Sequence, residues 1–125
     1  MNYWFLSAAF MSLVTLLVHF VAGGRFIARP LLAADELPVE VKYTSYYCWH
    51  LVTFILAGLV LAFVRAGIAA GGREVAASGV MFAMVAAAWS FAMVSRWRLP
   101  WYKFPQGVLF VLIALPGGLG LWFRS

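Results

Sequence analysis

Two histidines are the residues of this chain whose type and position could support chemistry inside a membrane. His19 and His50 each lie within a long stretch that contains no Lys, Arg, Asp or Glu. Ionisable side chains at such depth are energetically costly, so each is a candidate functional residue. If both stretches are helices joined by one loop, the helical rise puts both rings roughly 6–8 Å below the same membrane surface. The sequence therefore predicts a level pair of imidazoles.

The simplest function for this pair is structural, and it is the one we expect. Both rings would then hydrogen-bond to hydroxyls, carbonyls or each other, because polar side chains at matched depth commonly join membrane helices. Helical spacing places Thr15 on the face of His19 and Thr53 on the face of His50. These two hydroxyls are the predicted partners of the rings.

Two alternatives would make the pair a cofactor site or a metal site. Haem b could be ligated by both imidazoles, with Arg25 and Arg29 near the interface for its propionates. A metal site would have to include Cys48. Residues two apart on a helix point to different faces, so Cys48 and His50 cannot both face His19. Zinc also needs four ligands, and no carboxylate is available inside the membrane, so we expect no metal.

The uncharged stretches contain no acid, and this absence limits the possible functions. Without an Asp or Glu inside a span, the chain has no carboxylate for proton-coupled or cation-coupled exchange. In length and number of predicted helices the chain is similar to the small multidrug-resistance transporters. Those proteins carry a Glu in the first helix, and this chain has none, so the likeness is one of architecture. No nucleophile elbow, zincin helix or phosphate loop is present, and we expect no enzyme.

The elements that would position the histidines are transmembrane helices. Of the 125 residues 66% are hydrophobic and 10% are charged, whereas a soluble domain has about 25% charged residues. The charge-free stretches are 20 to 24 residues long, at 1–24, 43–64, 75–95 and 104–123. About 20 helical residues cross a membrane. We expect one all-α transmembrane domain over 1–125, a four-helix bundle of two antiparallel hairpins, with helices at about 3–24, 39–65, 74–96 and 104–123.

The basic residues of the loops predict the orientation of this bundle. Six lie in the first and third loops, at Arg25, Arg29, Lys42, Arg96, Arg98 and Lys103, and three lie on the other side, at Arg65, Arg73 and Arg124. Cytoplasmic loops carry the excess of Lys and Arg. We therefore expect both termini to lie on the external side. The protein itself is expected in the cell membrane, which in a bacterium is the inner membrane.

Small side chains predict how the bundle closes. Gly79, Ala83, either Ala86 or Ala87, and Ser90 recur at helical spacing in the third stretch. Membrane helices associate through close packing at small residues, so this stripe should face the other helices. Pro116 should kink the fourth helix. The polar segment Arg25–Pro38 is expected to connect the first two helices along the membrane surface.

These observations favour a small integral membrane interaction protein, either an accessory subunit of a membrane assembly or a lipid-contacting module. The expected partners are the lipid bilayer and a membrane protein or a second copy of the chain. Nucleic acid is not expected, because the basic residues do not cluster on a polar element. A haem-binding redox protein that uses His19 and His50 is the first alternative. A small oligomeric permease is the second.

Overall fold

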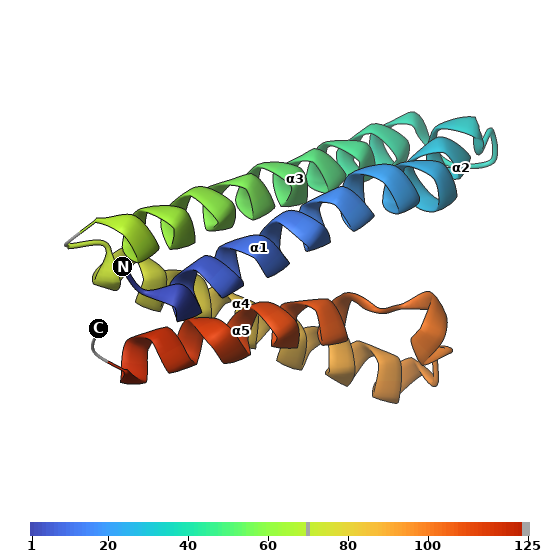
Figure 1. The fold of residues 1–125 in the computed structure, drawn as a ribbon. Coiled ribbons are helices and arrows are strands. Elements are labelled where there is room, and N and C mark those ends of the chain that lie inside the picture. The colour runs from blue at the N-terminus through green and yellow to red at the C-terminus, as the bar shows by residue number, and fades with distance from the viewer. Residues whose placement is uncertain (70, 124–125) are drawn as a thin grey trace.

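All regular structure in the described part of the chain is helical. The computed structural model describes residues 1–69 and 71–123 (Figure 1). Its elements in chain order are α1 (Tyr3–Leu17), the π-helical segment η1 (Val18–Ala28), α2 (Arg29–Ala33), α3 (Val39–Ile68), α4 (Arg73–Trp97), the short 3₁₀ turn η2 (Trp101–Lys103) and α5 (Gln106–Trp122).

The helices have the length and composition of membrane spans. Within the described residues, three are apolar and long enough to cross a membrane: Tyr3–Ala33, which joins α1, η1 and α2, then α3 and α4. The buried shares of their apolar windows are 28%, 22% and 22%, so most of the apolar surface faces outward. This arrangement is consistent with a multi-pass membrane protein. The apolar helix α5 is shorter, at 17 residues.

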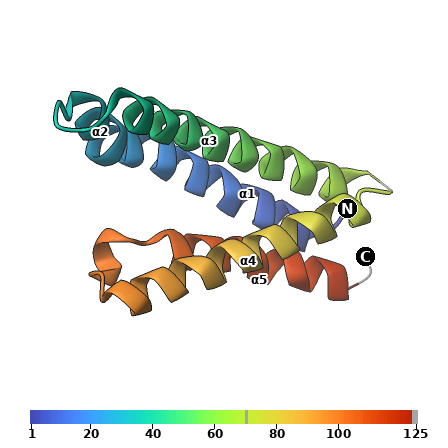
Figure 2. The same cartoon turned by 180° about the vertical axis from the view of Figure 1, so that it is seen from behind.

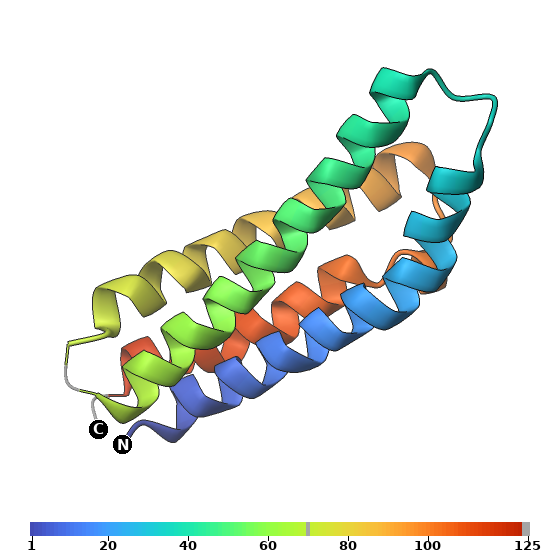
Figure 3. The same cartoon turned by 90° about the horizontal axis from the view of Figure 1, so that it is seen from above.

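The helices pack as two pairs that are close at one end only. α1 lies along α3 and α4 along α5, while α1 also contacts α5 and α3 contacts α4. Figures 1 and 2 show the pairs approaching each other at the end where α1 begins and diverging toward the end that carries α2 and η2. Seen from above, α3 crosses α4 at an angle (Figure 3).

Asn2 joins three helices at the end where the two pairs approach each other, which we call the closed end. Its side-chain oxygen caps α1 by accepting hydrogen bonds from the backbone N–H groups of Trp4 (3.0 Å) and Phe5 (3.3 Å). Its side-chain amide donates to the carbonyl of Gly120 in α5 at 3.2 Å. Its backbone N–H donates to the carbonyl of Gly67 in α3 at 2.8 Å. The start of α1 is thereby tied to both neighbouring helices.

Glycines let α5 approach the other helices closely. A Cβ atom added at Gly117 would lie 2.7 Å from Cγ2 of Val80 and 3.2 Å from the ring of Phe63, which is completely buried. One added at Gly120 would lie 2.6 Å from the ring of Phe5. Dispersion between closely packed surfaces is the main attraction between helices in lipid. These glycines therefore hold the closed end together.

The small-residue stripe of α4 faces the bundle as predicted. Gly79, Ala83 and Ala87 are buried, and the ring of Phe63 lies within 3.2 Å of the position of a Cβ atom at Gly79. Ser90, the last member of the stripe, is half-buried. The inward orientation of the stripe is confirmed for these residues.

The first helix extends beyond the expected end near residue 24. Helical winding continues through η1 and α2 to Ala33, although two consecutive glycines usually weaken a helix. Here Gly23 and Gly24 form a flat surface for the indole of Trp49. Cβ atoms added at these glycines would lie 3.5 and 4.0 Å from it. Packing of Trp49 against this surface offsets the low helix propensity of glycine.

Candidate functional site

A cleft of about 750 Å³ lies between the two helix pairs at their open end. One wall comes from α1, η1 and α3, and the other from η2, the start of α5 and the residues between them. Apolar residues dominate both walls; they include Val18, Ile27, Val52, Leu56, Leu109 and Phe110. Polar groups are few, and those with side-chain hydrogen-bonding atoms include His19, Lys103 and Gln106.

His19 is held against α3 by hydrogen bonds and by stacking. Its Nε2 atom lies 3.1 Å from the carbonyl oxygen of Trp49 and 3.2 Å from the hydroxyl of Thr53. The hydroxyl of Thr53 donates to the same Trp49 carbonyl at 3.4 Å. The imidazole also stacks on the indole of Trp49, with ring centroids 4.6 Å apart and 23° between the planes. The ring therefore has a fixed position at the cleft wall.

The structure places His50 beside the same indole as His19, in a different environment. The His50 ring meets Trp49 edge-on, with centroids 4.9 Å apart, and Tyr46 at 4.6 Å. His50 does not line the described cleft, whereas His19 does. Both rings are half-buried. The two histidines are thus neighbours around Trp49, and only His19 faces the cleft.

One of the two expected hydroxyl partners contacts a histidine. Thr53, which helical spacing placed on the face of His50, contacts the ring of His19. Thr15 also lines the cleft, but its hydroxyl donates to the carbonyl of Met11, one turn earlier in the same helix, at 2.8 Å. Hydroxyls of Ser and Thr often bond back to their own helix in this way.

The other sequence-predicted residues lie outside the cleft lining. Arg25 and Arg29 are exposed, and the guanidinium of Arg25 lies 5.5 Å from the ring centroid of Phe26. Cys48 is exposed as well. Ligation of haem by the two histidines, with these arginines near its propionates, stays a prediction.

No protein family, curated protein or solved structure that was compared matches this chain.

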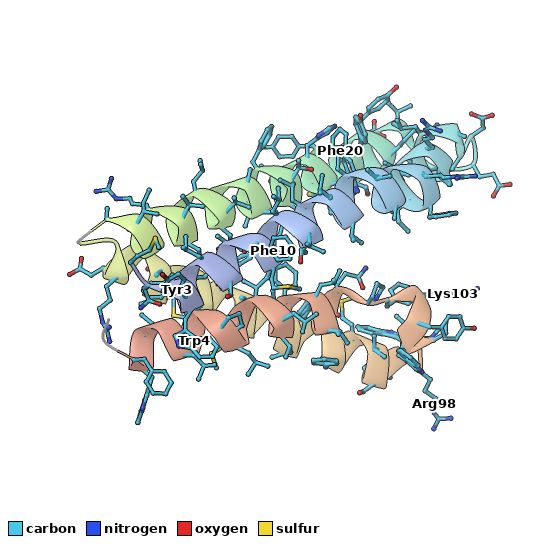
Figure 4. All side chains as sticks on the ribbon, in the orientation of Figure 1. Tyr3, Trp4, Phe10, Phe20, Arg98 and Lys103 are labelled. Carbon is cyan, nitrogen blue, oxygen red and sulfur yellow. The ribbon has the colours of Figure 1, made fainter. Side chains whose placement is uncertain are left out.

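Lys103 and Gln106 are cleft residues that the sequence did not single out. In the sequence, Lys103 contributes to the predicted orientation alone. Gln106 is the first residue of α5. Figure 4 shows Lys103 at the open end of the bundle, farther out than Phe20, the neighbour of His19. The adjacent aromatic residues Trp101 and Tyr102 were a signal that this loop lies at a headgroup surface. Its position opposite His19 depends on the packing of the two pairs.

This arrangement suits the binding of an elongated amphiphile. Its volume lies within the range of about 300–1,000 Å³ that is usual for small-molecule sites, and such sites combine apolar walls with a few polar groups. Here the walls can contact a hydrocarbon chain. Lys103, which Figure 4 shows at the open end, can contact an anionic group, and His19 lies on the opposite wall.

Proposed function

We propose that this chain is a non-enzymatic integral membrane module that holds a membrane lipid in the cleft between its two helix pairs. The observation that carries the proposal is the apolar cleft of about 750 Å³, whose lining includes Lys103 at the open end of the bundle (Figure 4). In a bilayer, apolar walls of this kind contact hydrocarbon more favourably than water. A lipid chain therefore suits the cleft better than a polar solute does.

Charge supports a lipid with an anionic headgroup. The cleft lies at the end of the bundle that carries Arg25, Arg29, Arg96, Arg98 and Lys103, the first three of them within helices. Basic residues near the cytoplasmic leaflet attract anionic headgroups with about 1 kcal/mol each. The net charge of the chain, +5, is also positive and therefore favours an anionic lipid.

The proposed orientation follows from the same residues. α1, α3, α4 and α5 cross the membrane as two antiparallel hairpins, with loops one and three in the cytoplasm and both termini outside. The 17 residues of α5 are at the short limit for a span. The cleft then opens to the cytoplasmic leaflet, in a bacterium that of the inner membrane.

Native mass spectrometry of the protein, released from a mild detergent, tests this function. Leu109→Trp adds a bulky ring inside the cleft, and Leu112→Trp makes the same change one turn later, at an exposed site outside the lining. We expect lipid adducts on the wild type and on Leu112→Trp, and loss of these adducts on Leu109→Trp.

Three other results would contradict the proposal. Equal lipid retention by both variants would place the lipid outside the cleft. A doubled protein mass in place of lipid adducts, lost in Leu109→Trp, would mean that a second copy of the chain occupies the cleft. A co-purifying membrane protein lost in the same variant would support the accessory-subunit interpretation instead.

A further inference from the structure

The hydrogen bonds of His19 assign a role to each of its ring nitrogens. Nε2 faces the carbonyl oxygen of Trp49 at 3.1 Å. A carbonyl oxygen only accepts hydrogen bonds, so Nε2 carries the proton and donates. In the uncharged ring, Nδ1 is then a lone-pair acceptor. The wall of the cleft therefore presents an acceptor that needs a donor.

Nδ1 of His19 is accessible from the cleft. Within residues 1–69 and 71–123, the hydrogen bonds of this ring involve Nε2. No buried polar side-chain atom in those residues lacks a partner, so Nδ1, which has none, is not buried. Nδ1 lies 3.9 Å from the position that a Cβ atom would occupy at Gly23, which also lines the cleft. Because Nδ1 has no partner and is not buried, a ligand that enters the cleft can approach it.

The polar groups of the cleft occur in a defined order along its length. Lys103 lies at the mouth, and Figure 4 shows it farther toward the open end than Phe20, which is adjacent to His19. The apolar walls at Val52, Leu56 and Leu109 provide the contact for a chain. A ligand that uses all three features has an anionic group outermost, then a hydrogen-bond donor, then hydrocarbon.

We propose that the cleft binds a monoacyl glycerophospholipid, in which the free central hydroxyl of the glycerol donates a hydrogen bond to Nδ1 of His19. The phosphate of such a lipid lies outward of this hydroxyl, next to Lys103, and its single chain lies against the apolar walls. A diacyl lipid has an ester at the position of the hydroxyl, and an ester cannot donate. This inference rests on the proposed lipid-binding function and names the class of lipid.

The hydroxyl is tested with two lipids that differ in one group. Monoacyl phosphatidylglycerol with a free central hydroxyl is compared with its analogue in which that hydroxyl is methylated. We expect the wild-type protein to bind the hydroxyl form about three- to tenfold more tightly, the range for one hydrogen bond between groups within a membrane protein. His19→Phe removes the acceptor and should bind both lipids equally. His19→Gln keeps an acceptor oxygen and should keep part of the preference.

The charge is tested separately at the mouth of the cleft. Lys103→Gln should reduce the preference for monoacyl phosphatidylglycerol over zwitterionic monoacyl phosphatidylcholine by about fivefold, as expected for one basic residue near headgroups. Lys42→Gln is the matched control. Lys42 lies 3.9 Å from Asp35, whose carboxylate offsets its charge, and it does not line the cleft. Lys42→Gln should therefore change the preference much less than Lys103→Gln does.

The results separate this inference from the function on which it rests. If the wild type binds none of these lipids, and Leu109→Trp retains as much diacyl lipid as Leu112→Trp, the proposed function is wrong. If lipid binds in the cleft but the wild type does not distinguish hydroxyl from methyl ether, the lipid class is wrong. A preference that persists unchanged in His19→Phe would also overturn it.

Discussion

The imidazole of His19 lies nearly flat against the indole of Trp49, with 4.6 Å between ring centroids, and its Nε2 donates to the carbonyl of that same residue. Through this double contact, η1 and α3 meet at the wall of the cleft. Gly23 lies directly beside the indole. Trp49 is thus the residue that positions His19 and supports the glycine pair of the first helix.

Replacement of Trp49 by Leu should therefore destabilise the protein. We expect a loss of about 1–3 kcal/mol, because the ring packs against four aromatic rings and covers Gly23. Thermal unfolding in detergent measures the change. Trp89→Leu is the control, since Trp89 is 67% exposed and should lose little. Equal melting temperatures of the two variants would contradict the positioning role of Trp49.

Loss of the Asn2 side chain should loosen the closed end. Asn2→Ala removes the cap of α1 and the hydrogen bond to the Gly120 carbonyl. An N-cap alone contributes about 0.5–2 kcal/mol, so we expect a destabilisation in the upper part of this range. Ser7→Ala deletes an exposed hydroxyl that bonds only within α1 and should be nearly neutral. A neutral Asn2→Ala would show that the closed end does not depend on this residue.

Two neighbouring glycines of α5 provide a test of close packing. Gly117→Ala would place a methyl group 2.7 Å from Cγ2 of the buried Val80, and overpacking of this kind costs about 1–3 kcal/mol. Gly118→Ala meets no described atom within 4 Å. It should be neutral or stabilise the helix by up to about 1 kcal/mol. Unfolding of both variants in detergent measures the difference, and the opposite order would mean that α5 is rotated.

The proposed orientation is testable with reporter fusions. Fusions at Gly71 and after the last residue should report an external location, and fusions in loops one and three a cytoplasmic one. A cytoplasmic signal at Gly71 would reverse the bundle. The cleft would then open to the external leaflet.

The helices could be predicted from the sequence because a helix that crosses a membrane needs about 20 residues without charge. The small stripe on α4 was also predictable, since close helix contact selects Gly79 and Ala83 for their size. The extension of the first helix to Ala33 was not. Its glycine pair indicated an end, and only the packing of Trp49 explains why helical winding continues there.

The cleft itself could not be predicted from the sequence. It exists because the two helix pairs are tied together near Asn2 and diverge toward η2, and this is a property of tertiary packing. His19 was identified from its depth alone, and Thr53 from helical spacing. The position of Lys103 across the cleft from His19 has no signature in the local sequence.

Photo-crosslinking with a lipid that carries a reactive group on its acyl chain is the most direct test of lipid binding in the cleft. After crosslinking in vesicles, peptide mapping locates the labelled residues. Binding in the cleft predicts concentrated labelling of Val52, Leu109 and Phe110, which line it. Labelling confined to outward-facing residues such as Phe54 and Leu61, which are 68% and 70% exposed, with none on the cleft walls, would contradict it.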